Sequence, residues 1–326
     1  MTSTFDSTAR PASVTHLHQN AASGFDLSAW SALQLQRVEA ALDRWVGGDL
    51  TSQADSAEFV PAGLSEAMRY AVLDGGKRLR PLLALAAAEA VGGHPEAALR
   101  SACAVELIHA YSLVHDDMPC MDNDVLRRGK PTVHVKFGEA QALLAGDALQ
   151  ALAFELLTPD AGVPAAMQAT LCRMLARAAG CAGMAGGQAI DLASVGKPLA
   201  SEQLHQMHRL KTGALLQASV LMGAACGEAG PSAQRALTDY GAAIGLAFQV
   251  VDDILDVVGD AGTLGKTAGK DAAQDKPTFV SLMGLHASQN YAQELLSQAR
   301  ASLKTDALRD TAALRALADR LVNRGH

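Results

Sequence analysis

The sequence predicts an all-α protein, because its composition and its apolar periodicity both favour helices. Aromatic residues make up only 4% of the 326-residue chain, and Ala and Leu dominate its hydrophobic 49%. Apolar residues recur at helical spacing, as in Leu33, Val38, Leu42 and Trp45. No segment alternates convincingly between apolar and polar residues as a half-buried strand would. We therefore expect a helical bundle of roughly ten helices.

Proline, glycine and N-cap signals place these helices along the chain. Pro81 opens an apolar run that ends at Gly92, Pro95 precedes a second and longer run, and Ser201 is a candidate N-cap. After a helix around residues 33–45, the expected helices cover residues 81–91, 95–117, 133–157, 164–193, 202–227, 233–259, 277–288, 291–303 and 310–324. No Pro/Ser-rich linker and no repeat period divides them, so we expect one domain over residues 26–326.

The first 25 residues are expected to form a disordered tail. They are rich in Ser, Thr, Ala and His and lack the basic start and apolar core of a signal peptide. Later apolar stretches are interrupted by charge or glycine before the roughly 18 residues that a membrane span requires. We therefore expect a soluble, cytoplasmic protein without a membrane span.

The charge balance and the cysteines exclude several functional classes. A formal charge of −7 does not provide the basic surface that nucleic acids require. The five cysteines are odd in number and form no Cys-x-x-Cys pair, so neither a disulfide framework nor a zinc site is expected. They are expected to be reduced thiols in the core. The acidic residues point to metal cations instead.

A first acidic cluster ends the apolar run that starts at Pro95. Asp116, Asp117, Asp122 and Asp124 place four carboxylates within nine residues. Such crowding becomes favourable when hard cations neutralise it, and Mg²⁺ prefers carboxylate oxygens together with water and phosphate oxygens. Pro119 should disturb the last helical turn and allow Asp122 to return beside Asp116.

A second acidic cluster, Asp252, Asp253 and Asp256, lies within a regular helical pattern. The i, i+4 spacing places Asp252 and Asp256 on one face, one turn apart, where they can share a cation. A solvated acidic helix end is the alternative, and for a single Asp-Asp-x-x-Asp motif it would be a serious one. Two such clusters inside apolar helices favour a metal site.

Two basic runs could bind a phosphate group without metal. Residues 75–81 read GGKRLRP and residues 127–131 read RRGKP, the second run directly after the first acidic cluster. The guanidinium forks of Arg and the point charges of Lys suit diphosphate oxygens. Either run alone would be better explained as a solvated loop.

The chain resembles the trans-prenyl diphosphate synthases (polyprenyl synthetases), and within that family the bacterial farnesyl diphosphate synthases. The resemblance extends, in the family's order and spacing, over residues 75–81, 116–131, 146–149 (GDAL), 211–213 (KTG), 248–253 (FQVVDD) and 264–266 (LGK). It departs from the family pattern at residues 275–280 (DKPTFV), and the tail has no counterpart. The resemblance implies one all-α domain, a helical bundle around a deep central cavity, and commonly a homodimer.

In this family an allylic diphosphate ionises to a carbocation, isopentenyl diphosphate attacks it, and the departed diphosphate accepts the proton that is lost. The resemblance implies three Mg²⁺ ions, with Mn²⁺ as a substitute, held mainly by Asp116, Asp122 and Asp252. Asp117, Asp253, Asp256 and Asp124 would lie mostly around these ligands. The residues implied to bind isopentenyl diphosphate are Lys77, Arg80, His109 and Arg128. Those implied to bind the allylic diphosphate are Arg127, Lys211 and Lys266. Thr212 and Gln249 are implied to line the allylic carbocation.

Product length is expected to depend on Tyr111 and Ser112, one turn before the first acidic cluster. Tyr111, together with two extra residues between Asp117 and Asp122, resembles the bacterial farnesyl pattern; an ordinary core tyrosine is the alternative. The expected product is therefore (2E,6E)-farnesyl diphosphate, with geranylgeranyl diphosphate as the alternative product. A terpene cyclase and a non-catalytic partner subunit are further alternatives. A terpene cyclase would not need a second diphosphate site, and a non-catalytic subunit would typically have lost carboxylates from one acidic cluster.

Overall fold

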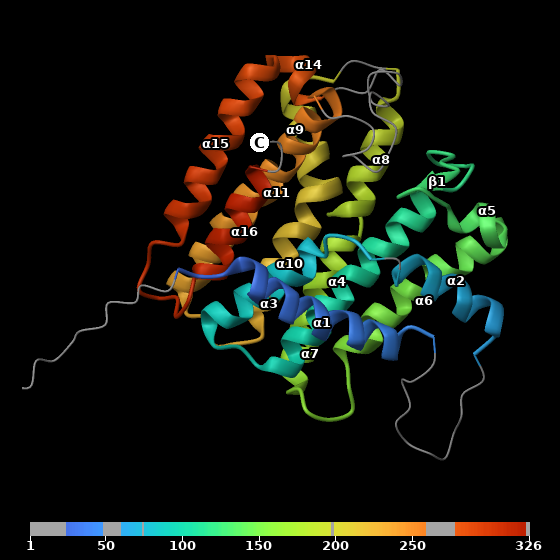
Figure 1. Ribbon diagram of the computed structural model, residues 1–326, viewed down its shortest axis with the longest axis horizontal. Helices are drawn as coiled ribbons and strands as arrows, with labels where there is room; N and C mark the ends of the chain where they lie inside the picture. The colour runs from blue at the N-terminus through green and yellow to red at the C-terminus, as the bar shows by residue number, and fades with distance from the viewer. Residues whose placement is uncertain (1–23, 48–59, 74, 197–198, 259–277, 324–326) are drawn as a thin grey trace, which may run out of the picture.

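The structure, a computed structural model, describes residues 24–47, 60–73, 75–196, 199–258 and 278–323, and it confirms the all-α prediction (Figure 1). The α-helices are α1 (Leu27–Trp45), α2 (Ala62–Val72), α3 (Leu79–Val91), α4 (Pro95–Asp116), α5 (Val133–Phe137), α6 (Glu139–Leu157), α7 (Ala165–Ala179), α8 (Met184–Ser194), α9 (Ser201–His208), α10 (Ala214–Ala225), α11 (Pro231–Val258), α14 (Phe279–Met283), α15 (Leu285–Ser302) and α16 (Ala312–Val322). A π-helical turn, η1 (Arg209–Gly213), joins α9 to α10. Strands β1 (Leu126–Arg127) and β2 (Lys130–Pro131) form a short antiparallel hairpin.

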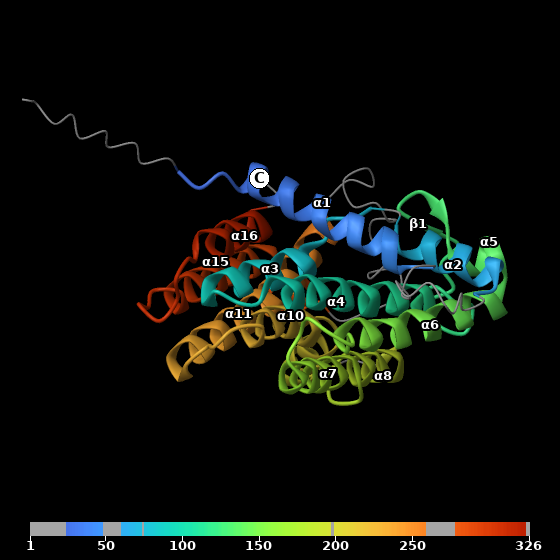
Figure 2. The same ribbon diagram turned by 90° about the horizontal axis from the view of Figure 1, so that it is seen from below.

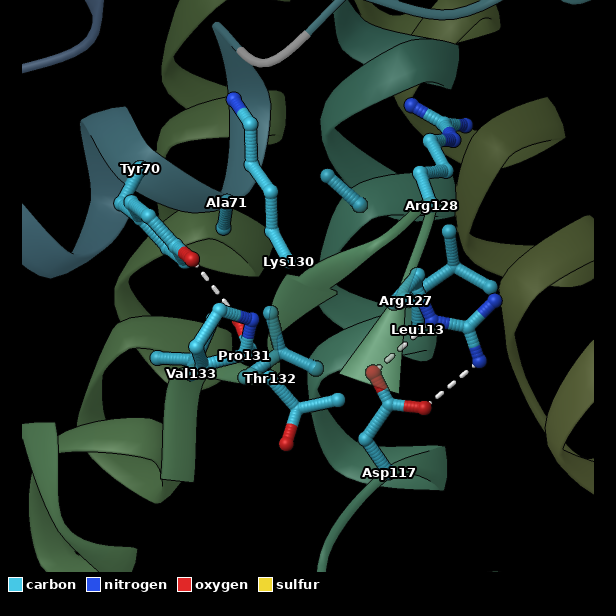
Figure 3. Close-up of a pocket in the computed structure, with 12 residues that line it drawn as sticks. Tyr70, Ala71, Leu113, Asp117, Arg127, Arg128, Lys130, Pro131, Thr132 and Val133 are labelled. Atoms are coloured by element: carbon cyan, nitrogen blue, oxygen red, sulfur yellow. Dashed lines mark hydrogen bonds and ion pairs between the residues drawn. The ribbon is translucent and has the colours of Figure 1, made fainter. Parts of the chain in front are cut away.

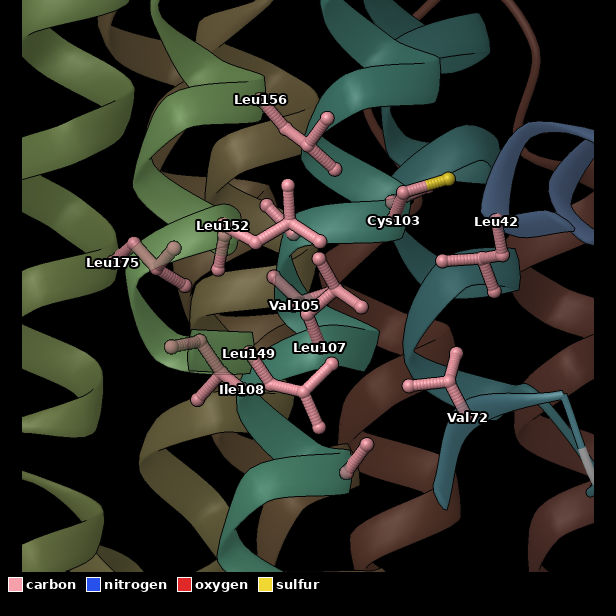
Figure 4. Close-up of a cluster of buried hydrophobic side chains, with 14 of the residues drawn as sticks. Leu42, Val72, Cys103, Val105, Leu107, Ile108, Leu149, Leu152, Leu156 and Leu175 are labelled. Carbon is pink, nitrogen blue, oxygen red and sulfur yellow. The ribbon is translucent and has the colours of Figure 1, made fainter. Parts of the chain in front are cut away.

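Helix α4 lies at the centre of the bundle, with α1 on one side and α7 on the other (Figure 2). It is buried on most of its circumference, which explains why its sequence is apolar rather than amphipathic. Figure 4 shows Leu107 and Ile108 of α4 in one cluster with Leu149 and Leu152 of α6. A second cluster gathers around α10, α11, α15 and α16. The two clusters hold the C-terminal ends of α4 and α11, where the aspartates lie.

Glycines allow the central helices to approach closely. A Cβ atom at Gly223 in α10 would lie 2.1 Å from the carbonyl oxygen of Ala84 in α3. A Cβ atom at Gly146 in α6 would lie 2.0 Å from His115 Nε2 in α4. Both distances are too short for real atoms. A side chain at Gly223 would push α3 and α10 apart, whereas one at Gly146 would first displace the His115 ring.

Glycines also interrupt helices that were predicted to be continuous. The helix expected over residues 133–157 is divided at Gly138, whose φ of +87° disfavours other residues. The helix expected over 164–193 stops at Gly180 and resumes after Gly183. The break expected between residues 288 and 291 is wrong, because the chain turns at Gly284 (φ +83°) and α15 continues through both positions.

Several smaller features were missed by the sequence. Helix α2 and the β1–β2 hairpin were not predicted, and the helix expected over 202–227 is interrupted by η1. Ser201 is the first residue of α9 rather than its N-cap, which is Ala200. Helix α1 begins after Asp26, whose Oδ1 accepts hydrogen bonds from the Ser28 and Ala29 amides. The predicted tail lies almost entirely outside the described residues.

The premise that every apolar stretch is too short to span a membrane needs a correction. In the described part of the chain, α4 and α6 are long and apolar enough to pass a test for membrane-spanning helices by length and composition. Core helices of water-soluble proteins pass the same test. In α4, 67% of the apolar 18-residue stretch that passes it is buried inside the bundle. The corresponding share for α6 is 44%.

Candidate active site

The first acidic cluster forms a compact loop at the C-terminal end of α4. The amide of Asp122 donates to the carbonyl of Asp116 (2.9 Å), and the amide of Asp124 donates to the carbonyl of Asp117 (3.1 Å). Asn123 turns the chain with a φ of +51°, a conformation that Asn tolerates better than most residues. The predicted return of Asp122 to Asp116 is therefore confirmed for the backbone.

The Asp116 carboxyl group lies in an environment that disfavours its ionised form unless a cation is bound. Burial raises its pKa to about 6, and the charges of Asp122 and Asp117 act in the same direction, while Lys211 and Arg127 oppose them. A half-buried carboxyl group with carboxylate neighbours gains most from a hard divalent cation. Among the described residues no group of three or more His, Cys, Asp or Glu side chains is placed to hold a metal ion. Diphosphate and water oxygens would complete a Mg²⁺ site, so the donor set fits this ion.

Asp117 binds Arg127 in a two-pronged ion pair (Figure 3). Arg127 Nε donates to Oδ2 at 2.8 Å and Nη2 donates to Oδ1 at 2.6 Å, and Asp117 is only 3% exposed. The pair joins the acidic loop to the hairpin. A carboxylate can accept further bonds, so a metal contact of Asp117 stays a prediction.

The two basic runs meet in the structure. Arg128 Nη1 donates to the carbonyl oxygen of Gly75 (2.6 Å), which places the hairpin over the turn that precedes α3. Arg78 in this turn is buried and has a φ of +43°; it donates to Glu106 (2.8 Å), Glu39 (2.7 Å) and the Val72 carbonyl. Arg78 therefore holds in place the turn that carries Lys77 and leads into Arg80 at the start of α3.

His109 lies among these arginines. Burial lowers its pKa well below the usual value, and the positive charges of Arg80, Arg128, Arg127 and Arg78 lower it further. The imidazole is thus neutral at pH 7 and can still donate one hydrogen bond. Arginine charges that act together near one neutral ring favour binding of a polyanion at this position.

Lys211 connects the acidic loop to the opposite wall of the bundle. It lies in η1 and donates to Asp191 of α8 in a close ion pair. Burial lowers its pKa, but Asp191, Asp116 and Asp122 offset this effect and the pKa is raised overall. Lys211 therefore stays charged beside Asp116. Single π-helical turns are frequent at functional sites.

Glycines on both neighbouring helices make room for η1. A Cβ atom at Gly187 of α8 would lie 2.1 Å from the Lys211 amide nitrogen, and one at Gly245 of α11 would lie 3.1 Å from Gly213 Cα. The π-helical turn is therefore clamped between α8 and α11, and Lys211 and Thr212 project from a fixed backbone.

The second acidic cluster is joined to η1 by a chain of hydrogen bonds. Thr212 Oγ1 donates to Gln249 Oε1 (3.2 Å), and Gln249 Nε2 donates to Asp253 Oδ1 (2.7 Å). Asp253 Oδ2 accepts from the Phe279 amide (2.8 Å) at the start of α14. The predicted cation-lining residues Thr212 and Gln249 are thus in direct contact. Metal binding by Asp253 stays a prediction.

The remaining aspartates of this cluster differ in exposure. Asp252 is half-buried, whereas Asp256 is buried and its Oδ1 has no hydrogen-bond partner among the described residues. Such an unsatisfied oxygen is compatible with a cation ligand. The predicted sharing of one cation by Asp252 and Asp256 stays a prediction, and Lys266 lies outside the described residues.

Tyr111 and Ser112 lie on α4 before the acidic loop, as predicted. The Tyr111 ring packs edge-on against His115 with centroids 5.7 Å apart, and Ser112 Oγ donates to the His109 carbonyl (2.8 Å). Burial raises the pKa of Tyr111, and a hydrogen bond with Gln150 opposes this shift. Their role in product length stays a prediction.

Two site residues were missed by the sequence. Asp191 was not singled out, although it sits four residues after Gly187 in the run MAGGQAIDL. His208 precedes η1 and stacks on Phe279 with centroids 5.5 Å apart; burial lowers its pKa to about 4, while a hydrogen bond with Gln249 opposes this shift. The glycines of this run were the sequence signal that could have pointed to Asp191. No such sequence signal marks His208.

The fold and the site together define an all-α protein that gathers carboxylates, lysines and arginines from distant segments into adjoining polar sites. A model of the polyprenyl synthetase family matches residues 61–315, and the chain belongs to that family. It is 51% identical over 265 residues to farnesyl diphosphate synthase of Escherichia coli (strain K12), covering 79% of this chain and 88% of that protein. It is 48% identical over 266 residues to a chloroplastic geranylgeranyl pyrophosphate synthase of Capsicum annuum, covering 81% and 72%.

A solved structure gives the same result for the fold. The geranyltransferase of Helicobacter pylori, complexed with magnesium and isoprenyl diphosphate, superposes with a TM-score of 0.76 at 35% identity. The match covers 92% of this chain and 98% of that chain.

Proposed function

We propose that this chain is a farnesyl diphosphate synthase, a transferase that condenses isopentenyl diphosphate with dimethylallyl and then geranyl diphosphate, head to tail. The products are (2E,6E)-farnesyl diphosphate and diphosphate. The observation that carries the proposal is that α4 presents an arginine-surrounded His109 and a carboxylate loop at Asp116, seven residues apart. Two turns of helix separate them, so two anionic substrates can lie side by side along α4.

The basic site around His109, which needs no metal, suits the diphosphate group of isopentenyl diphosphate. Lys77, Arg80 and Arg128 supply positive charge, and neutral His109 supplies a hydrogen bond. Arg78 stabilises the turn before α3, next to this site, through its ion pairs with Glu39 and Glu106. Guanidinium groups bind phosphate oxygens in pairs, which fixes the orientation of the substrate as well as its position.

The carboxylate site suits the allylic diphosphate together with Mg²⁺. Asp116 and Asp122 on one side and Asp252 on the other would hold the ions, three in number, with Mn²⁺ as a substitute. When bound, Mg²⁺ stabilises the negative charge that develops on the leaving diphosphate. Lys211 contributes a charge that does not depend on metal, held in place by Asp191, and Arg127 and Lys266 would complete the clamp.

The chain's own residues would then govern the carbon chemistry. The C1–O bond of the allylic substrate breaks and its electron pair leaves with the diphosphate. The oxygens of Thr212 and Gln249 stabilise the allylic cation without forming a bond to it. The isopentenyl double bond attacks C1, and the proton lost from isopentenyl C2 passes to the departed diphosphate.

The product-length proposal is tested by chromatography of dephosphorylated products formed from labelled isopentenyl diphosphate. Mainly fifteen-carbon alcohol is the expected result, and Tyr111 with Ser112 would form the end of the tail pocket. Mainly twenty-carbon alcohol would favour the geranylgeranyl alternative, which the Capsicum annuum relative keeps open.

Two controls address the other classes. Incubation with dimethylallyl diphosphate alone should give no hydrocarbon, whereas a terpene cyclase needs no second substrate. An Asp252→Ala variant with unchanged turnover would indicate a non-catalytic subunit. Turnover should vanish in EDTA and return with Mg²⁺ or Mn²⁺, which tests the metal requirement.

We also propose that the enzyme is a cytoplasmic homodimer. Leu143 and Leu144 on α6 are 47% and 52% exposed, and Val135 on the preceding helix α5 is 50% exposed. Exposed apolar side chains grouped on a long helix favour an interface between protein chains. Light scattering of the purified protein should give twice the chain mass of 33.8 kDa.

A further inference from the structure

Asp253 is engaged on both of its carboxylate oxygens. Oδ1 accepts from Gln249 Nε2 (2.7 Å) and Oδ2 accepts from the Phe279 amide (2.8 Å), and the residue is only 2% exposed. Gln249 and Asp253 are four residues apart on α11, so their side chains lie on one face of the helix. These bonds constrain the orientation of Gln249.

The hydrogen-bond chain has a fixed direction. An ionised carboxylate can only accept hydrogen bonds, so the Gln249 amide must present its NH₂ group to Asp253 and its Oε1 to Thr212. The Thr212 hydroxyl therefore donates its single hydrogen to Gln249 Oε1 (3.2 Å). The lone pairs of Thr212 Oγ1 are left for another partner. A reversed amide would accept nothing from Thr212 and would turn the hydroxyl hydrogen outward.

We propose that Asp253 is a positioning residue that sets, through Gln249, the polarity of the Thr212 hydroxyl toward the allylic cation. The inference rests on the proposed function, because it concerns the cation formed in that reaction. Oxygen lone pairs lower the energy of a nearby carbocation, whereas a hydroxyl hydrogen directed at the same point raises it. Asp253 thereby acts on the reacting atoms without touching them.

The surroundings keep this direction fixed. Phe279, whose amide holds Asp253, is fully buried; it packs edge-on against His205 with centroids 4.8 Å apart and is stacked on His208 with centroids 5.5 Å apart. Burial lowers the pKa of His208 to about 4, so its ring is neutral at pH 7. On the other side, Gly245 allows the close packing of α11 against η1 that brings Thr212 within reach of Gln249.

Asp253→Asn tests the proposal because it should reverse the chain. The Phe279 amide still needs an acceptor, so the side-chain oxygen of the introduced amide would face it and the introduced NH₂ group would face Gln249. Gln249 would then turn its own NH₂ group to Thr212. We expect kcat to fall on the order of tenfold, with KM for both substrates changed less than about twofold. Asp239→Asn, on the exposed face of α11, is the matched control and should leave kcat unchanged.

A double-mutant cycle separates positioning from other roles. If Asp253 acts through Thr212, Asp253→Asn should have little further effect in a Thr212→Val background. If the fold-losses of kcat in the two single variants multiply in the double variant, the proposal is overturned. A raised Mg²⁺ requirement of Asp253→Asn would also overturn it, because it would make Asp253 a metal ligand. Gln249→Met interrupts the chain without touching the Phe279 contact, and it should show the same coupling to Thr212→Val even if Asp253→Asn does not fold. No condensation by the wild-type enzyme would refute the proposed function as well, whereas additive losses in an active enzyme refute only this inference.

Discussion

Gly187→Ala should displace the π-helical turn that carries Lys211 and Thr212. The added Cβ would lie 2.1 Å from the Lys211 amide nitrogen and 2.5 Å from Lys211 Cα, whereas ordinary contacts begin near 3.4 Å. Both neighbours are backbone atoms, so the turn or α8 must move by more than about 1 Å. A misplacement of this size in an active site can lower turnover about 100-fold. Overpacking should cost about 1–3 kcal/mol, partly offset by about 1 kcal/mol from the better helix propensity of alanine.

Steady-state kinetics with isopentenyl and geranyl diphosphates, together with urea unfolding, test this prediction. Gly63→Ala is the matched control, because a Cβ at this α2 position meets only Gln141 Nε2, at 3.4 Å. The control should keep wild-type kcat and equal or higher stability. A Gly187→Ala enzyme with wild-type kcat would refute the reasoning, since it would show that the position of η1 does not control the site.

Three further predictions concern the charged and aromatic residues. Replacing Asp116 or Asp252 with Ala should lower kcat by orders of magnitude while far-UV circular dichroism and Tm stay near wild type, because these residues bind the leaving group rather than the core; loss of folding would contradict this role. His208 titrates near pH 4 when folded against 6.5 for an ordinary histidine, so below pH 6.5 the unfolded chain binds the proton more readily. Between pH 7 and pH 5 this should remove about 2 kcal/mol of stability from the wild type. That difference should be absent from His208→Gln, and equal urea midpoint shifts in both proteins would exclude the effect. Tyr111→Ala should lengthen the product, as seen by chromatography, and an unchanged product would place the end of the pocket elsewhere.

Local sequence was sufficient for the fold class and for the acidic and basic runs; His109, Lys211, Thr212 and Gln249 were named only through the family resemblance. Helical periodicity and the scarcity of aromatic residues predicted the helices, and the aspartate and basic runs marked the polar segments. The return of Asp122 to Asp116 was also predictable, because Pro119 and Asn123 act within the same loop. These features depend on residues close together in the chain.

Helix boundaries were less predictable where glycine was involved. A glycine can end a helix, as Gly138 and Gly284 do, or permit close packing within one, as Gly187 and Gly223 do. The sequence looks alike in both cases. The difference lies in whether the backbone takes a positive φ or a neighbouring helix approaches within contact distance.

The sequence alone determined which charged groups the protein carries and that helices present them; the tertiary structure decided which of them are paired. Arg78 belongs to a basic run expected to bind phosphate, but its partners Glu39 and Glu106 became visible only in the structure. Asp191 gained a role only from Lys211, twenty residues away. Asp253 likewise depends on Phe279, from a separate helix. Burial makes an unpaired charge costly, so each partner is set by the packing of distant helices, which spacing along the chain does not record.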